Sequence, residues 1–391
     1  MPVLRCFLLF AASRSNMILG FLIAVAFDPY SWTGATSLRW ALLAIALPGL
    51  CFFSSPNNFD LTKLLGIGFI AWAALSLTWS PNQWDAYGTL IQLLIIAAGF
   101  VYGNRVSSLK PIFTGLAIGV TVSAAILLSP TLQGLTSGSP VSTYPHGLWG
   151  NRNMMGEIAV LSALGCLAYG RYWFIPGLLP AIFYYKPDIM SGVPSRGAVG
   201  ALMAGICVWL WPRSKVASGL LAAALLVGGT AALGFGNRFG PVYERLEVWQ
   251  AVLHGVTLRG NGIGSLYTLA PYLTDIFDTT MRRVDHAHNE FIEILFELGV
   301  IGAGLYITII TLALRNADTK SLTVLVGFLV ISCVAFPWHI PANAFVGSLV
   351  LGHAVRSRMS LRDQYALCRA SIRGWSERQR KAIRRSHPEP A

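Results

Sequence analysis

Charged residues are scarce in this chain, and several common chemical motifs are absent from it. Only 12% of the 391 residues are charged and 54% are hydrophobic, with a mean hydropathy of +0.58. Soluble globular domains carry about 25% charged residues, so this composition predicts an all-α polytopic membrane protein. No Walker A, GxGxxG or HExxH pattern occurs, and the Gly-rich "GFGNRFG" at 234–240 opens no βαβ unit, so a nucleotide loop is not indicated.

Cysteine is also sparse and is not arranged in pairs. The six cysteines form no Cys-x-x-Cys spacing, and most of them lie inside apolar runs. We therefore predict small core residues rather than a disulfide framework or a zinc site. The positions are Cys6, Cys51, Cys166, Cys207, Cys333 and Cys368.

Apolar runs recur along the chain at lengths that suit a membrane. A bilayer core of about 30 Å takes roughly 20 apolar residues in a helix. The first run, at 15–28, is expected to be an uncleaved helix, preceded or interrupted by Arg14-Ser15-Asn16, rather than a signal peptide. We predict about twelve transmembrane helices, near residues 15–28, 38–54, 61–79, 86–103, 109–128, 152–170, 172–186, 196–211, 215–235, 287–312, 321–338 and 341–355.

The basic residues indicate an orientation for these helices. With the C-terminus in the cytoplasm, 20 of the 29 Lys and Arg fall on the cytoplasmic side, as the positive-inside rule requires, and both termini are cytoplasmic. The tail is interpreted as an anchor on anionic lipid rather than a specific partner site. The predicted organisation is transmembrane helices 1–9 in residues 1–235, one long periplasmic loop with amphipathic helices at 236–286, transmembrane helices 10–12 in residues 287–355 and a basic cytoplasmic tail at 356–391.

The long loop carries five arginines on the side where the rule disfavours them. Either they bind an anionic ligand, or they form ordinary surface salt bridges with acidic residues of the same loop. These arginines are Arg238, Arg245, Arg259, Arg282 and Arg283. The loop also predicts an amphipathic helix lying against the bundle or the membrane face, with one apolar stripe made by Val242, Leu246, Trp249 and Leu253.

The stretch "DHAHNEFIEILFELGVIGAGLY" at 285–306 places titratable side chains at the mouth of an apolar segment. Asp285 is a predicted N-cap, and the helix that follows has a single acidic face. Acidic groups at membrane depth usually face a polar cavity or a partner. The predicted face consists of His286, Glu290, Glu293 and Glu297.

The two histidines of this stretch do not by themselves indicate a metal. On a helix His286 and His288 would not face each other, and no third ligand is evident, so no metal site is predicted. A lone histidine such as His288 is more often a hydrogen-bonded interface residue than a functional group. Local pattern alone therefore leaves the role of His288 open.

Four segments together resemble the bacterial O-antigen ligase and polymerase superfamily. "HAHNEFIEILFELGVIG" is similar to its signature of a His followed by Asn or Ser, a helix, an acidic residue and two glycines, here His288, Asn289, Glu297, Gly299 and Gly302. Three further segments agree in order, "GLWGNRNMMGEIAVLSALG" at 147–165, "SRGAVGALMAG" at 195–205 and "RLEVWQAVLHGVTLRGNGIGSL" at 245–266. The resemblance covers about residues 60–350, and the first sixty residues show no match.

The resemblance implies a GT-C-type glycosyltransferase of the bacterial inner membrane with its active site facing the periplasm. The implied donor is a glycan on undecaprenyl diphosphate, and the implied acceptor is lipid A-core or another glycan. Membrane lipids surround the chain, and neither a cofactor, a metal nor a nucleic acid is expected.

Residue by residue, the resemblance implies that Arg196 and Arg245 match the essential arginines of the family and that His288 matches its essential histidine. Guanidinium forks suit diphosphate oxygens, and an imidazole can accept or orient the acceptor hydroxyl. We also assign substrate binding to Arg259, Asn289, His286, Glu293 and Arg152.

Alternatives remain open at this level. A polysaccharide polymerase of the same superfamily would use the same residues with a different acceptor. A transporter of lipid-linked sugars is a weaker alternative, because no internal repeat is found and the titratable cluster lies at the outer rim. For Glu293 and Glu297, packing against a polar cavity and pairing with Arg196 or Arg245 are both plausible.

Overall fold

The computed structural model describes residues 2–26, 34–53, 60–129, 147–149, 152–183, 195–234, 240–274 and 285–356. Within these ranges every regular element is a helix, which confirms the all-α prediction. A helix suits long apolar runs because it pairs its backbone groups within the segment.

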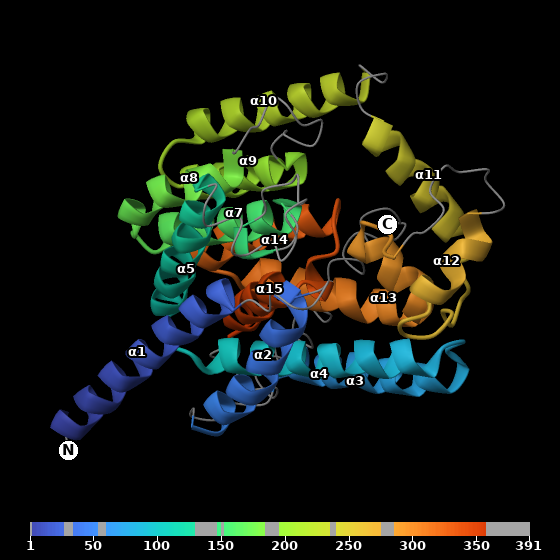
Figure 1. The fold of residues 1–391 in the computed structure, drawn as a ribbon, viewed down its shortest axis with the longest axis horizontal. Coiled ribbons are helices and arrows are strands. Elements are labelled where there is room, and N and C mark those ends of the chain that lie inside the picture. The colour runs from blue at the N-terminus through green and yellow to red at the C-terminus, as the bar shows by residue number, and fades with distance from the viewer. Residues whose placement is uncertain are drawn as a thin grey trace, which may run out of the picture.

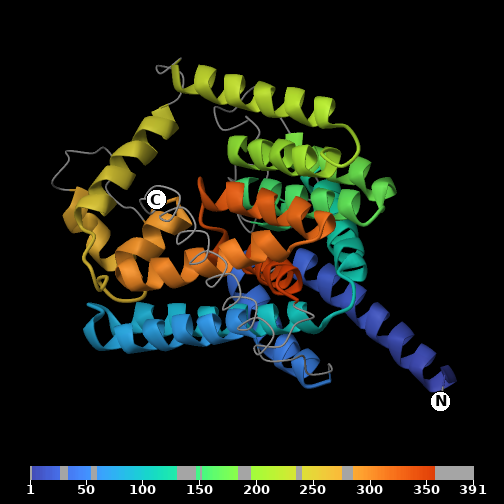
Figure 2. The same cartoon turned by 180° about the vertical axis from the view of Figure 1, so that it is seen from behind.

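The helices are stacked in layers around α13 (Figures 1 and 2). On one side, α13 (Glu290–Asn316) packs on α3 (Leu61–Ser76), and α4 (Gln83–Arg105) lies beside α3. The other layers and the N-terminal elements are α1 (Pro2–Val25), α2 (Gly34–Phe53), η1 (Leu77–Trp79), α5 (Lys110–Leu128), η2 (Gly147–Trp149), α7 (Arg152–Ala168), η3 (Tyr172–Phe174), α8 (Ile175–Phe183), α9 (Arg196–Leu210), α10 (Lys215–Gly234), α14 (Thr319–Ser332), η5 (Pro337–His339) and α15 (Pro341–Ala354).

The main hydrophobic core lies between these layers. Helix α14 packs on α9 and α7, α10 covers α9, and α15 packs on α4. Of the cysteines with described side chains, Cys166 is buried, and Cys51 and Cys207 are half-buried. Cys333 is exposed, so its prediction as a core residue is wrong. Cys6 and Cys368 lie outside the described side chains.

One prediction for the N-terminal part is corrected. Helix α1 begins at Pro2 and runs through Arg14-Ser15-Asn16 without a break. Arg39, near the start of α2, is buried, and its guanidinium donates to the carbonyls of Ile23 at 2.7 Å and Leu148 at 3.0 Å. A buried charge needs such partners, and here they are the free carbonyls at the end of α1 and in η2.

All twelve predicted segments overlap helices of the structure. Among the described residues, four helical segments are long and apolar enough to cross a membrane, and they are Leu61–Trp79, Gln83–Arg105, Lys110–Leu128 and Glu290–Asn316. Twelve crossings therefore stay a prediction, while several apolar helices of membrane-crossing character are found.

Two helices, α11 (Gly240–His254) and α12 (Leu266–Thr274), form a separate layer at one end of α13 (Figure 1). The buried face of α11 consists of Val248, Ala251 and Val252, while Leu246 and Leu253 are exposed. The predicted apolar stripe is therefore not the face that packs on the bundle, and its position on the membrane face stays a prediction. The other face of α11 turns toward a second small core shared with α12 and Phe296 of α13.

A kink at Gly299 divides α13. Gly299 has φ 65° and ψ −165°, a conformation that only glycine adopts readily. The kink frees backbone groups, and the loop between α11 and α12 pairs with them: Gly262 N–H donates to the Glu297 carbonyl at 2.9 Å, and Val300 N–H donates to the Leu258 carbonyl at 3.1 Å. A Cβ at Gly299 would clash with the Leu258 carbonyl oxygen. The glycine thus lets the loop dock directly on α13.

Candidate functional site

The segment before α13 is not helical. Its last residue, Asn289, is extended, and its side-chain oxygen accepts hydrogen bonds from the N–H groups of Phe291 at 3.0 Å and Ile292 at 3.2 Å. Asn289 is therefore the N-cap, and the predicted cap at Asp285 is wrong. The helix begins at Glu290, so His286 lies outside it. The prediction that His286 belongs to the acidic face of this helix is therefore also wrong.

His288 has a left-handed backbone with φ 52°, which is uncommon for a residue other than glycine. Its half-buried ring lies edge-on to Phe336, with ring centroids 5.0 Å apart. Burial and the positive charge of Arg245 lower the pKa of His288 to about 4. The imidazole is therefore neutral near pH 7, which is the form that can accept a proton.

Two arginines reach the same region from different helices. Arg245 is a half-buried residue of α11, and Arg196 is an exposed residue that begins α9 after the N-cap Ser195. The charge of Arg245 acts on Arg196, on His288 and on Glu157 of α7. Burial lowers the pKa of Arg245, which the carboxylate of Glu157 opposes. Arg245 of α11 therefore lies close to both Arg196 of α9 and His288 of the loop before α13.

Glu157 is a site residue that the sequence reasoning missed. It is buried in α7, and its Oε2 accepts a hydrogen bond of 2.7 Å from the Asn343 side chain of α15. Glu157 lies in the segment quoted at 147–165, but no pattern of charged residues there marks it as functional. Only the approach of Arg245 marks it as a neighbour of the site.

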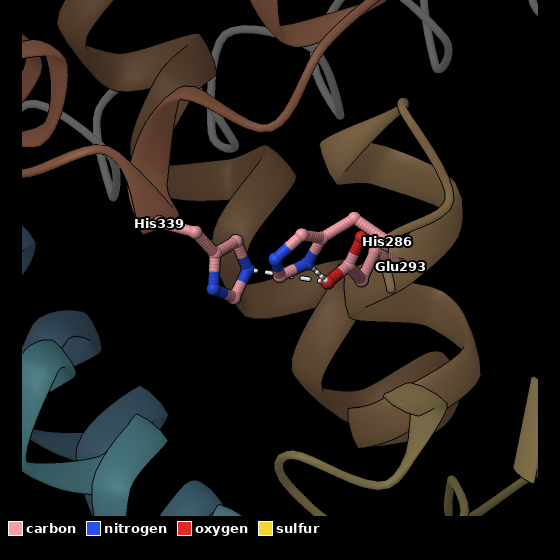
Figure 3. Close-up of side chains that lie close together, drawn as sticks. All are labelled: His286, Glu293 and His339. Atoms are coloured by element: carbon pink, nitrogen blue, oxygen red, sulfur yellow. Dashed lines mark hydrogen bonds and ion pairs between the residues drawn. The ribbon is translucent and has the colours of Figure 1, made fainter. Parts of the chain in front are cut away.

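The carboxylate of Glu293 joins three parts of the chain (Figure 3). Its Oε1 lies 2.8 Å from Nδ1 of His286 and 3.2 Å from Nε2 of His339, and its Oε2 accepts a 2.9 Å hydrogen bond from the Ala287 N–H. The sequence had suggested Arg196 or Arg245 as partners of Glu293, and it had suggested neither histidine. Glu293 instead connects α13 to the segment before it and to η5.

His339 lies in η5, between α14 and α15. Its Nε2 is 3.9 Å from Oε2 of Glu290, whose other oxygen accepts a 2.8 Å hydrogen bond from the Trp338 N–H. Burial alone would lower the pKa of His339, but the carboxylates of Glu293 and Glu290 outweigh it and raise the pKa to about 9. The ring is therefore a cation at neutral pH beside two buried acidic groups.

His286, Glu293 and His339 also form the one group in the described part of the chain with metal-ligand geometry. Their candidate ligand atoms lie within 4.8 Å of one another, and two imidazoles with a carboxylate are a donor set that Zn²⁺ accepts. The sequence had offered no third ligand, because His339 is remote along the chain. Hydrogen bonds between the same atoms already satisfy them, with the two imidazole rings 4.3 Å apart and tilted by 38°.

The remaining predicted residues lie around this centre. Glu297 accepts a hydrogen bond of 3.1 Å from the Leu266 N–H at the start of α12, and it lines an apolar cavity of about 410 Å³ together with Glu290, Glu293 and His339. The exposed Arg259 lies over Trp79, 5.4 Å from its ring centroid. The side chain of Arg152, like Arg238, Arg282 and Arg283, lies outside the described part.

Comparison with known proteins agrees with this picture. Residues 192–307 match the family described as O-antigen ligase, which confirms the resemblance seen in the sequence. The matched segment contains both arginines of the site and His286 to Glu293, but neither Glu157 nor His339. No curated protein matches the chain.

Proposed function

We propose that this chain, from the O-antigen ligase superfamily, is a glycosyltransferase that moves a glycan from undecaprenyl diphosphate to a lipid A-core acceptor. The family match supports a ligase or polymerase class of enzyme acting in a membrane on lipid-linked glycans. The observation that carries the proposal is the convergence of Arg196, Arg245 and a neutral His288 from separate elements.

In the proposed reaction the acceptor hydroxyl oxygen attacks the anomeric carbon of the donor glycan. The bond from that carbon to the diphosphate oxygen breaks, and the diphosphate leaves with the electron pair. Negative charge therefore builds on the diphosphate, where the guanidinium groups of Arg196 and Arg245 offer paired N–H donors. Arg196 is exposed at the start of α9, where a headgroup can approach it, and the half-buried Arg245 holds its charge within the site.

His288 takes the proton that the acceptor hydroxyl loses. Its imidazole is neutral near pH 7, so a ring nitrogen lone pair is available as the bond forms. With two arginines supplying positive charge, the transfer proceeds without a divalent metal in this scheme. Arg259, Asn289, His286, Glu293 and Arg152 are proposed to contribute to binding around these three.

The site faces the periplasm of the inner membrane in this scheme, with residues 236–286 outside and both termini in the cytoplasm. The uneven placement of Lys and Arg supports that orientation. Tyr272, an exposed residue of α12, offers a test by single-cysteine labelling in a background without native cysteines. An impermeant reagent added to intact spheroplasts should label Tyr272→Cys and not Ser371→Cys; the reverse result would overturn the orientation.

The experiment for the function is a transfer assay with purified protein in detergent. Wild type should form the glycan-acceptor product and release undecaprenyl diphosphate, and EDTA should not change the rate. Arg196→Lys and Arg245→Lys keep the charge but lose the fork, so both should lose most of their activity. Arg213→Lys is the matched control, because Arg213 is an exposed arginine just beyond the opposite end of α9. Wild-type rates in both test variants would show that the paired contacts do not matter.

The acceptor separates the two branches of the superfamily. Lipid A-core and a second lipid-linked glycan would be offered in parallel, and the products would be separated by mass. Transfer only to the second lipid-linked glycan would replace the ligase by a polymerase with the same site.

A further inference from the structure

We propose that His339 is a positioning residue for the transfer reaction, holding the His286–His288 segment in its working conformation through the carboxylate of Glu293. The inference rests on the proposed function and deepens it. His339 does not touch the reacting atoms in this view. It acts on the backbone that carries His288.

The first step is the position of Glu293 between two partners. One of its oxygens accepts the Ala287 N–H, in the residue directly before His288, at 2.9 Å. Its other oxygen is shared by His286 at 2.8 Å and His339 at 3.2 Å. A buried carboxylate with several donors has its orientation fixed by all of them, so loss of one donor loosens the others.

The second step is the backbone of His288 itself. A left-handed residue other than glycine persists only where its surroundings determine it strongly. Three contacts do so here: Ala287 N–H on Glu293, the Ala287 carbonyl accepting from Trp249 Nε1 at 2.8 Å, and the cap at Asn289. The first of them depends on where the Glu293 carboxylate points.

The third step is the way the chain fixes His339. The preceding residue, Trp338, donates from its backbone to Glu290 at 2.8 Å and from its indole to the Tyr306 hydroxyl at 2.7 Å, so η5 is tied to α13 at two points. Phe336, in the same turn, stacks on the His286 ring at 4.3 Å and meets His288 edge-on at 5.0 Å. One short segment therefore contacts both site histidines and supplies the third donor to Glu293.

The kinetic experiment compares His339→Ala, His339→Gln, Glu293→Gln and the double variant His339→Ala/Glu293→Gln in the transfer assay. A misplacement of about 1 Å can cost about 100-fold in rate, so kcat of His339→Ala should fall by up to about that factor while KM for the donor stays within about twofold. His339→Gln keeps an N–H donor and should recover most of kcat. His254→Ala is the control, because His254 is exposed at the C-terminal end of α11, where its Nδ1 lies 2.8 Å from the Gln250 carbonyl of the same helix.

The double variant tests whether the effect runs through Glu293. Non-additivity is expected, with the double variant no slower than the slower single variant, because both changes break one linked set of contacts. Multiplied losses would overturn the inference, as would an unchanged kcat in His339→Ala. The inference would also be overturned if EDTA inhibited the wild type and Zn²⁺ restored its activity, because His286, Glu293 and His339 would then be metal ligands.

A second measurement needs no substrate. Hydrogen exchange of the peptide that contains the Ala287 amide should be faster in His339→Ala than in wild type, with peptides of α9 unchanged, and His339→Gln should exchange like wild type. Unchanged exchange at Ala287 would overturn the inference even if no transfer were detected. Absence of transfer in the wild type would overturn the proposed function alone.

Discussion

The two halves of α13 have opposite chemistry although they belong to one helix. Before Gly299 the helix buries Glu290, Glu293 and Glu297, each 7% exposed or less. After Gly299, Val300, Ile301 and Ile307 are each at least 50% exposed, as residues that face lipid can be. The kink separates them, so a segment with buried acidic groups can continue directly into one that suits a membrane.

The difference shows how buried carboxylates are accommodated. Each one in the first half is paired with a group from outside the helix: Trp338 for Glu290, His286 and His339 for Glu293, and Leu266 for Glu297. The exposed apolar side chains of the second half make no such demand, because an apolar side chain in lipid needs no partner. Substitutions in the two halves should therefore differ sharply in effect.

The largest effect is expected just before the polar half. Removing the imidazole in His288→Ala should lower kcat by about 10²- to 10⁴-fold, the usual contribution of a general base. Donor binding should be retained, since the arginines are unchanged. The transfer assay and a separate donor-binding measurement check both points. His286→Ala should be milder, because its Nδ1 is already paired with Glu293, and full activity in His288→Ala would remove the base role.

A single methyl group added at Gly299 tests the kink between the two halves of α13. Gly299→Ala forces a side chain into a conformation reserved for glycine, which costs on the order of 1–3 kcal/mol, and the new Cβ meets the Leu258 carbonyl. The apparent Tm in detergent should fall, with loss of activity as the loop leaves α13. Gly304→Ala is the matched control in the same helix, since a Cβ there has open space. Equal melting of the two variants would contradict the docking role of Gly299.

The pH at which the transfer rate falls on the acid side tests the environment of His288. Its pKa is lowered to about 4, so the neutral form persists as the pH falls from about 8 to about 5, and protonation removes the base only below that. The transfer rate should therefore be flat over this range and fall near pH 4. A fall beginning near pH 6.5, the usual value for histidine, would show that His288 is neither desolvated nor influenced by Arg245. Gel filtration at each pH controls for unfolding.

The smallest effect is expected on the lipid-suited half. Ile307→Val shortens an exposed side chain and should change stability by less than about 0.5 kcal/mol. Ile310→Val, on the buried side of the same helix, should cost about 0.5–1.5 kcal/mol. Thermal melting of the pair measures the contrast, and equal shifts would show that the two faces do not differ as described.

Sequence alone located the helices well, because apolar runs of suitable length leave few alternatives. It failed where tertiary contacts decide local detail. Asp285 and Asn289 are both good caps, and only the left-handed turn at His288 selects the second. For α11 the sequence did not show which face packs on the bundle, and Val248 and Val252, not Leu246, meet the small core there.

The site was predicted in part for the same reason. Arg196, Arg245 and His288 carry a recognisable pattern and do come together. Glu157 and His339 stand alone in apolar segments, and no local spacing connects them to the residues they serve. Long-range electrostatic and hydrogen-bond partners of this kind become visible only when separate helices are packed against each other.

The docking of the α11–α12 loop has a consequence for biogenesis. Trp72 of α3 donates its indole N–H to the Leu298 carbonyl, 226 positions later in the chain, and the Ile263 backbone pairs with the side chains of Ser76, the last residue of α3, and Ser80, just after η1. The ribosome delivers α3 early and α13 late, so these contacts can form only after most of the polypeptide has been synthesised. In the proposed scheme both arginines are therefore synthesised before the histidine segment, and a chain truncated ahead of residue 285 would lack His288.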